Sequence, residues 1–281
     1  MKRKFKVLLT RRLHKFAVEK LRERYEITVH NGKIPIPKKT ILQKIKNKDG
    51  LICFPYDIID KEIIDSAKKL KSISTYSVGF DHIDVNYARK KKISIGYTPR
   101  VLTNATAELT IGLMMDLLRR ITEGDHIIRK GKWTEIFGPF DYVGTEISGK
   151  IIGILGMGRI GKTVAKKASC LGMHVLYHNR KPITKTGKAK YVSLNELFKK
   201  SDVISIHVPY SKNTHHMINS KLLNKMKKSS FLINTSRGKV VNQKDLLKAL
   251  QLKKIQGAAL DVFEDEPISK SNDLVKIKNI V

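Results

Sequence analysis

The sequence predicts an α/β protein of two domains, each built on a doubly wound parallel β-sheet. Three observations support this fold class. Short apolar segments alternate with amphipathic segments of helical length over residues 1–98, a long amphipathic stretch follows at 105–133, and the alternation resumes after Gly149. Strands that alternate with helices of about ten residues or more indicate parallel βαβ units. We therefore expect domains at 1–98 and 99–281.

The first domain is expected to contain strands separated by surface helices. Strand candidates are short runs rich in β-branched and apolar residues, such as "FKVLLT". Helix candidates carry apolar residues near helical spacing, such as "LHKFAVEKLRERY". The expected strands are 5–10, 26–30, 50–54, 71–77 and 93–98, and the expected helices are 13–25, 38–47, 61–70 and 85–93.

The second domain begins with the stretch 105–133, which reads as one long amphipathic helix or as two helices in series. Its length and position suggest a spine that joins the two halves of the chain. Beyond Gly149 the same alternation predicts further βαβ units. The expected strands are 150–155, 174–178, 203–208, 230–235, 255–262 and 277–281, and the expected helices are 160–171, 194–201, 220–227 and 243–251.

The composition is that of a globular chain. It is 41% hydrophobic over 281 residues, which suffices for two cores, and no apolar run approaches the ~20 residues of a membrane helix. The basic start lacks the apolar stretch of a signal peptide. Cys53 and Cys170 lie far apart, which argues against a disulfide framework or a zinc site. We therefore expect a cytoplasmic location, no metal and no membrane partner.

The net charge of +31 raises the question of a nucleic-acid partner, because basic surfaces attract phosphate backbones. The excess charge is spread along the chain: residues 1–98 carry +14 and residues 99–281 carry +17. A dedicated binding stripe would be more concentrated. A solvated lysine-rich surface is the favoured interpretation, with a polyanion-binding role as the alternative, and we expect no specific nucleic-acid partner.

A glycine-rich turn, Gly156-x-Gly158-x-x-Gly161, follows an apolar strand candidate and opens a helix candidate. In this context the first glycine permits the tight turn, the second lets the backbone approach a pyrophosphate, and the third allows close packing of helix on strand. The helix N-terminus offers N–H groups to phosphate. We expect Gly156, Gly158, Arg159, Ile160 and Gly161 to bind a dinucleotide.

The end of the next strand bears on which dinucleotide is bound. An acidic residue there would bond the ribose 2′-hydroxyl of NAD. Here Asn179 is followed by Arg180 and Lys181, which would attract a 2′-phosphate. NADPH is therefore the favoured cofactor and NADH the alternative; the two cations could also contribute only to the general basicity.

Several blocks together resemble the D-isomer-specific 2-hydroxyacid dehydrogenases, and within them the glyoxylate/hydroxypyruvate reductases. Tyr97 stands where lactate- and phosphoglycerate-type relatives usually have asparagine. The blocks, which span nearly the whole chain in the family's order, are "YSVGFDHIDV" (76–85), "GYTPRVLTNATAELTIGLMMDLLRR" (96–120), "GILGMGRIGKTVAKKA" (153–168), "SDVISIHVPYSKNTHHMIN" (201–219), "MKKSSFLINTSRGKVVNQKDLLKAL" (226–250) and "GAALDVFEDEP" (257–267).

The resemblance implies roles for particular residues. The main-chain amides of Val78 and Gly79 would bind the substrate carboxylate, although without the resemblance this turn would read as a simple β-turn. Arg237, in "NTSRG", matches the catalytic arginine that grips the carboxylate and polarises the carbonyl. Glu266, next to Pro267, matches the acid that pairs with the catalytic histidine and raises its pKa.

The resemblance also implies the fold, the further cofactor contacts and the partners. It implies two Rossmann/flavodoxin-like domains with a cleft between them, and a homodimer that acts on a small 2-oxo or 2-hydroxy acid. The expected contacts near the nicotinamide are Thr235, Ser236 and Asp261. Those expected near the adenosine are His207, Val208, Pro209 and Thr214.

In the family, the catalytic histidine follows the last strand in a Pro-His-Ile-Gly pattern. Here the sequence ends at Val281, within the expected last strand, and none of the nine histidines lies in such a pattern. Two interpretations stay open at this point. The chain is a shortened form of an active reductase, or it is a non-catalytic dinucleotide-binding regulatory module of the same fold; its Arg237 and Glu266 favour the enzyme.

Overall fold

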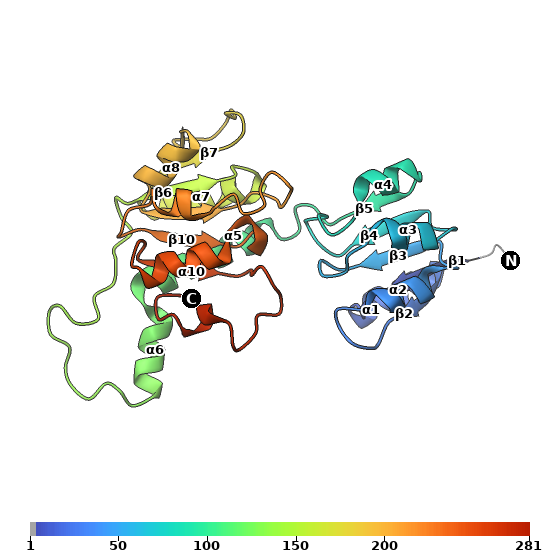
Figure 1. Ribbon diagram of the computed structural model, residues 1–281, viewed down its shortest axis with the longest axis horizontal. Coiled ribbons are helices and arrows are strands. Elements are labelled where there is room, and N and C mark those ends of the chain that lie inside the picture. The colour runs from blue at the N-terminus through green and yellow to red at the C-terminus, as the bar shows by residue number, and fades with distance from the viewer. Residues whose placement is uncertain (1–3) are drawn as a thin grey trace. The chain divides into compact units, whose positions relative to one another are not determined.

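The computed structural model describes residues 4–281 and consists of two compact α/β units that divide between Leu102 and Thr103 (Figure 1). The sequence analysis placed this boundary four residues earlier, after residue 98. Residues 1–3, which the domain prediction included, lie outside the described residues. Within residues 4–281, no helix is both long and apolar enough to cross a membrane.

The first unit is a parallel sheet of five strands in the order β2-β1-β3-β4-β5. This order is that of flavodoxin-like folds. The strands are β1 (Phe5–Leu9), β2 (Tyr25–Val29), β3 (Gly50–Cys53), β4 (Ser72–Thr75) and β5 (Ser94–Gly96), and the helices are α1 (Lys15–Arg24), α2 (Lys38–Ile45), α3 (Lys61–Ser66) and α4 (Val85–Lys90).

Each face of this sheet has its own apolar core. Val18 of α1 packs with Val7 and Leu9 on one face. Helices α2, α3 and α4 cover the other face, where the core includes Ile41 and Ile63. Because parallel sheets bury both faces, their strands read as continuous apolar runs, which is why the alternation was visible in the sequence.

The second unit is a six-stranded parallel sheet in the order β11-β10-β9-β6-β7-β8. Counted from β6, this is the doubly wound order 3-2-1-4-5-6, which reverses between β6 and β9. The strands are β6 (Ile151–Leu155), β7 (His174–His178), β8 (Lys190–Tyr191), β9 (Val203–Ile206), β10 (Phe231–Asn234) and β11 (Gly257–Leu260).

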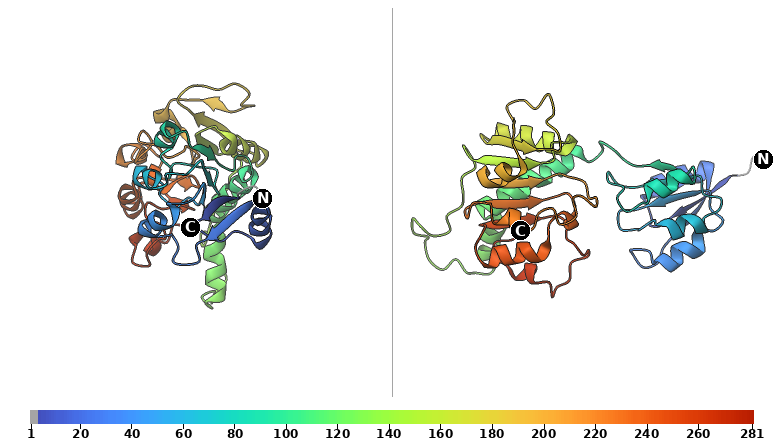
Figure 2. Two further views of the ribbon diagram at one scale, coloured as in Figure 1. Left: turned by 90° about the vertical axis from the view of Figure 1, so that its right-hand side faces the viewer. Right: turned by 45° about the horizontal axis from the view of Figure 1, so that its top comes forward.

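Two layers of helices cover this sheet (Figure 2). On one face the apolar residues of α5 and α7 form a core with strand residues such as Ile152 and Ile233. On the other face α8, α9 and α10 pack over residues such as Ile204 and Leu232. These helices are α5 (Thr103–Arg119), α7 (Arg159–Cys170), α8 (Leu194–Lys200), α9 (Ser220–Leu223) and α10 (Gln243–Gln251).

The long amphipathic stretch forms two helices in series, α5 and α6 (Ile121–Arg129). Arg120 separates them in the left-handed conformation, with φ +56°. The N–H of Thr122 donates to Asp116 Oδ1 at 2.6 Å, which supplies an acceptor for the start of α6. Helix α6 has no buried residue and extends away from the sheet of its unit (Figure 1).

One expected strand is absent from the described residues, and one short strand was not expected. The segment 277–281 is not a strand: a 3₁₀ helix at Asp273–Lys276 precedes it, and only Ile280 bridges to Ala258. The residues of this segment are apolar because Ile277 and Ile280 pack against the core that α10 also covers. Strand β8 was missed because its two residues, Lys190 and Tyr191, carry no apolar alternation.

Candidate active site

The residues predicted for the second unit lie where its parallel strands end. The carboxyl ends of such strands meet at one edge of the sheet, which is where α/β folds bind ligands. The glycine turn follows β6, Asn179 to Lys181 follow β7, His207 to Pro209 follow β9, Thr235 to Arg237 follow β10, and Asp261 follows β11.

The glycine turn packs against the neighbouring strand end so closely that two of its glycines admit no side chain. Gly156 has φ +97°, and a Cβ there would lie 2.8–2.9 Å from the backbone of His207 and Val208. A Cβ on Gly161 would lie 2.2 Å from the carbonyl oxygen of Gly156. Gly158, in contrast, has no protein atom within 4 Å of its Cβ position.

This geometry suits the diphosphate of a dinucleotide. Helix α7 is twelve residues long, and Gly158 at its N-cap provides no side-chain acceptor for the first-turn N–H groups. No acidic residue occupies the first turn. The N–H groups of Arg159, Ile160 and Gly161 thus have no partner within the helix and carry its positive end. The open space beside Gly158 lets an anion reach them.

Asn179 ties the end of β7 to this turn, because its Oδ1 accepts a hydrogen bond from the N–H of Met157 at 2.8 Å. From the sequence we expected Asn179 only as the neutral residue beside a 2′-phosphate; its hydrogen bond to Met157 is a second role, for which spacing provides no signal. Arg180 and Lys181 are exposed beside it. The end of β7 thus carries one neutral side chain that is held in place, Asn179, and two solvated cations, Arg180 and Lys181.

The end of β9 carries a histidine that is neutral at pH 7. His207 Nε2 lies 2.8 Å from the hydroxyl of Ser205, and burial lowers the pKa of His207 to about 4. Near neutral pH the ring is therefore an uncharged imidazole and not an imidazolium acid. Thr214 closes the following loop, since its hydroxyl contacts the carbonyl of Pro209 at 2.8 Å and accepts from the N–H of Ser211 at 2.8 Å.

The turn after β10 is organised by the buried side chain of Asn234. Its Oδ1 accepts from the N–H and the hydroxyl of Ser236, at 3.0 and 2.8 Å, and its Nδ2 donates to the carbonyl of Arg237 at 3.0 Å. The guanidinium of Arg237 donates to the carbonyl of Ser236 at 2.9 Å. Thr235 is held from the other side, 2.8 Å from the hydroxyl of Thr110 in α5.

Gly238 brings this arginine turn against the acidic loop that follows β11. A Cβ on Gly238 would lie 1.8 Å from the carbonyl oxygen of Phe263, so only glycine permits the contact. In the acidic loop, Glu266 accepts a hydrogen bond from the N–H of Phe263 at 2.8 Å. Partial burial and the nearby charge of Glu266 raise the pKa of Asp261. Arg237, Asp261 and Glu266 therefore belong to two loops in direct contact.

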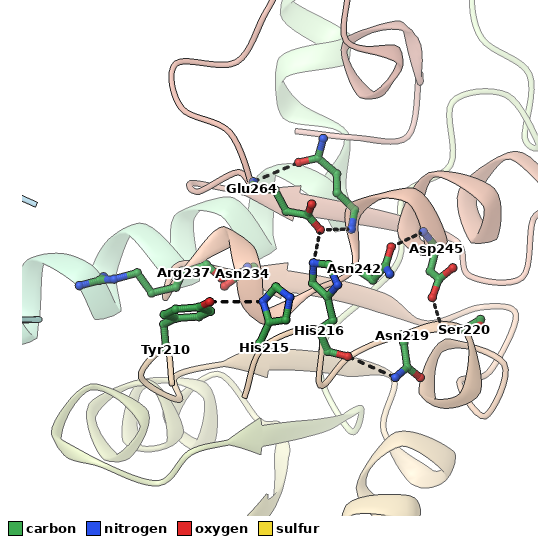
Figure 3. A network of polar contacts seen from close by, with 11 residues as sticks. Tyr210, His215, His216, Asn219, Ser220, Asn234, Arg237, Asn242, Asp245 and Glu264 are labelled. Atoms are coloured by element: carbon green, nitrogen blue, oxygen red, sulfur yellow. Dashed lines mark hydrogen bonds and ion pairs between the residues drawn. The ribbon is translucent and has the colours of Figure 1, made fainter. Parts of the chain in front are cut away.

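Glu264, two residues before Glu266, has a different environment (Figure 3). Its Oε1 accepts from the N–H of Gln243 at 2.7 Å and lies 2.9 Å from His216 Nε2. Three segments of the unit converge on this carboxylate, which is half-buried, whereas Glu266 is exposed. Glu264 therefore links the acidic loop to Gln243 and His216, whereas the carboxylate of Glu266 stays accessible to solvent. Sequence reasoning missed His216, since nothing in the pattern links it to a residue 48 positions later.

In the first unit, Val78 and Gly79 form a half-buried turn shortly after β4. Among residues 4–281, neither of their N–H groups donates to a protein acceptor. Backbone N–H groups that are partly buried and without a partner are costly unless a ligand or water accepts from them. Successive free N–H groups of this kind form the concave anion sites found in many proteins.

We predict that Gly158→Ala and Gly161→Ala separate cofactor binding from folding. Gly158 has φ −80°, so alanine fits the fold, but its methyl group occupies the space that a phosphate would need. Titration of NADPH fluorescence should show an affinity loss on the order of tenfold or more, with an unchanged melting temperature. Gly161→Ala should instead lower the stability by about 1–3 kcal/mol in thermal unfolding, because of the 2.2 Å contact.

Gly112→Ala in α5 is the matched control, because its Cβ position is open and it lies in a helix. It should change neither cofactor affinity nor, except for a small gain, stability. Unchanged NADPH affinity in Gly158→Ala would contradict the phosphate position.

Comparison with known proteins agrees with this geometry. The family described as "D-isomer specific 2-hydroxyacid dehydrogenase, NAD binding domain" matches residues 111–281. A curated relative named glyoxylate reductase, from Thermofilum pendens, is 45% identical, and the match covers 98% of this chain and 83% of the relative.

Solved structures extend the likeness to both units. A structure of the TT0316 protein of Thermus thermophilus superposes with a TM-score of 0.91 at 41% identity, covering 98% of this chain and 88% of that one. The NADPH-dependent glyoxylate/hydroxypyruvate reductase of Sinorhizobium meliloti, solved with NADP and malonate, has a TM-score of 0.86 at 26% identity, covering 99% and 85%. The chain therefore belongs to the D-isomer-specific 2-hydroxyacid dehydrogenases, oxidoreductases that use a nicotinamide dinucleotide.

Proposed function

We propose that the protein reduces a small 2-oxo acid, glyoxylate or hydroxypyruvate, to the 2-hydroxy acid with NADPH. The observation that carries the proposal is the arginine turn in direct contact with the acidic loop, at the same sheet edge as the glycine turn. A dinucleotide-binding module without catalysis has no need of an arginine and an exposed carboxylate in this arrangement. The similarity to glyoxylate reductases supports the substrate class.

Two groups of this chain are proposed to bind the substrate carboxylate. The N–H groups of Val78 and Gly79 are donors without a protein acceptor among the described residues. Arg237 provides a planar guanidinium that can grip a carboxylate with two parallel hydrogen bonds. Its backbone is fixed through Asn234, so little freedom of the turn is lost when the substrate binds.

The bound nicotinamide would supply the hydride for the keto carbon. As negative charge develops on the carbonyl oxygen, we propose that Arg237 stabilises it electrostatically. The alkoxide that forms must also take up a proton, which a histidine supplies in this family. None of the nine histidines here lies in the family's Pro-His-Ile-Gly pattern, and Glu266 is proposed as the carboxylate that would pair with such a histidine and raise its pKa. The carboxyl of Glu266 is exposed, so it is accessible for that pairing, whereas Glu264 is occupied by Gln243 and His216.

We predict that Arg237→Ala lowers kcat/KM for glyoxylate and hydroxypyruvate by on the order of 100-fold or more, because carboxylate binding and charge stabilisation are both lost. Arg237→Lys should recover little, since an ammonium cannot make the bidentate contact. Activity is measured as NADPH oxidation at 340 nm. Oxamate binding to the NADPH-loaded chain compares the unaltered chain with the two Arg237 variants without turnover.

Lys239→Ala is the control for this experiment, because it removes an exposed cation two residues away. It should leave both readouts unchanged. Near-normal activity in Arg237→Ala would refute the assigned role. If the unaltered chain binds the dinucleotide but shows neither turnover nor oxamate binding, the regulatory-module interpretation is favoured.

The preference for NADPH is proposed from the end of β7. Asn179 has no charge to repel a 2′-phosphate, and Arg180 and Lys181 can each approach it from solvent. The double variant Arg180→Ala/Lys181→Ala should therefore weaken NADPH binding by about tenfold or more, with little change for NADH. Fluorescence titration at constant ionic strength measures both affinities.

The exposed cations Lys185 and Lys188 lie in the same loop and provide a matched double variant with the same loss of charge. Its NADPH affinity should stay near that of the unaltered chain. Equal losses in the two double variants would show that only the overall charge acts on the cofactor, and would remove the basis for a specific 2′-phosphate contact.

We further propose a homodimer formed through α6 and the segment that follows it. Large apolar side chains on this segment are exposed, which in a folded protein marks an interaction surface. Ile136 and Phe140 are 93% and 91% exposed, and Trp133, Phe137 and Tyr142 stack in sequence. A second copy of the chain is the proposed occupant.

Light scattering should give a mass about twice 32.0 kDa for the unaltered chain, and a monomer for Phe140→Asp. Phe16→Asp is the control, because Phe16 on α1 is 66% exposed but lies outside this segment. It should leave the dimer intact. A mass of 32.0 kDa for the unaltered chain at micromolar concentration would exclude this dimer.

A further inference from the structure

We infer that Ser77 is a positioning residue for substrate binding: a directed chain of hydrogen bonds that ends at its hydroxyl fixes the Val78–Gly79 turn and leaves the two amide groups free for a carboxylate. The inference rests on the proposed function of that turn. It concerns the side chains of His82, Thr75 and Ser77 and the carbonyl of Gly79, none of which takes part in the reaction itself.

The chain of contacts runs from His82 to Gly79. His82 Nε2 lies 2.9 Å from Thr75 Oγ1, and Thr75 Oγ1 lies 2.7 Å from Ser77 Oγ. Ser77 Oγ lies 2.5 Å from the carbonyl oxygen of Gly79. Thr75 and Ser77 are only 2% and 6% exposed, so water has little access to replace these bonds.

The direction of every proton in this chain follows from one fact, which is that a carbonyl oxygen can only accept. Ser77 must therefore use its single hydroxyl proton toward Gly79, and Thr75 must donate its own proton to Ser77. The oxygen of Thr75 then accepts from His82, so the proton of the ring resides on Nε2.

This direction decides what the turn can bind. A serine at the start of a turn commonly accepts a hydrogen bond from a backbone N–H two residues later. Here the oxygen of Ser77 already accepts from Thr75, and Ser77 donates to the carbonyl two residues later. The ring that this bond closes contains two peptide units, those that carry the N–H groups of Val78 and Gly79. These hydrogen bonds thus hold the N–H groups of Val78 and Gly79 in place without accepting from either of them.

The neighbour of His82 at the start of these hydrogen bonds is an uncharged thiol. Cys53 Sγ lies 3.8 Å from the same ring nitrogen. Burial, with a smaller contribution from the charge of Asp57, raises the pKa of the Cys53 thiol to about 12. The thiol therefore stays protonated near neutral pH and places no negative charge beside the proton that His82 directs to Thr75.

The test measures oxamate binding to the NADPH-loaded 281-residue chain by calorimetry. Ser77→Ala should weaken oxamate binding by about tenfold or more, because the two amide donors lose their fixed orientation. NADPH affinity should not change. Ser77→Thr keeps the hydroxyl and should recover most of the loss, a rescue that a purely steric role would not show.

Ser66→Ala is the matched control, since the hydroxyl of Ser66 also donates to a nearby backbone carbonyl of the first unit, that of Ile63, at 2.8 Å. It should leave oxamate binding unchanged. If Ser77→Ala fails to fold, Thr75→Val removes the donor to Ser77 with little change of shape. The hydroxyl of Ser77 is then free to accept from the turn, and oxamate binding should again weaken.

The outcomes separate this inference from the proposed function. Oxamate binding of normal strength in both Ser77→Ala and Thr75→Val would overturn the inference and leave the proposed function intact. If the unaltered chain binds NADPH but no oxamate at millimolar concentration, the proposed function fails and the inference fails with it.

Discussion

The candidate site depends on backbone approaches that leave no room for a Cβ atom. Gly161 packs the start of α7 onto Gly156, and Gly156 packs the glycine turn onto the end of β9. Gly238 brings the arginine turn into contact with Phe263. These contacts determine where the N–H groups of α7, the guanidinium of Arg237 and the acidic loop lie within the second unit. Because interiors are close-packed, a displacement at one of them would be felt at its neighbours.

Side chains of the same type have different roles in this site because they contact different partners. Glu264 and Glu266 differ by two positions, yet the first binds Gln243 and His216 while the second remains exposed. Ser77 and Asn234 are both buried and both hold a turn through its backbone, and neither side chain is proposed to contact the substrate. Side chains of this kind orient the groups that meet the substrate, and they are part of the site in that sense.

The sequence was informative wherever a pattern repeats along the chain. Apolar alternation predicted both sheets, and the bounds 243–251 of the expected helix coincide with α10. The sequence left open whether 105–133 is one helix or two, which the left-handed Arg120 decides. The expectation of a strand at 277–281 was wrong, because packing onto the core explains the apolar residues there. Asn179 and His216 contact residues that only folding brings close, and the hydroxyl of Ser77 donates in a direction that its neighbours determine. Neither property can be recognised in the amino-acid sequence. The boundary and the site assignments stay predictions of that analysis.

In the proposed reaction a hydride passes from a nicotinamide bound on the second unit to a 2-oxo acid. Isotope transfer tests this step: the protein is incubated with hydroxypyruvate and NADPH that carries deuterium in place of both hydrogens of nicotinamide C4, and the product is analysed by chiral chromatography with mass spectrometry. We expect glycerate of a single configuration, the D-isomer, with one deuterium at carbon 2. Bound NADPH with no deuterium in any product would contradict it.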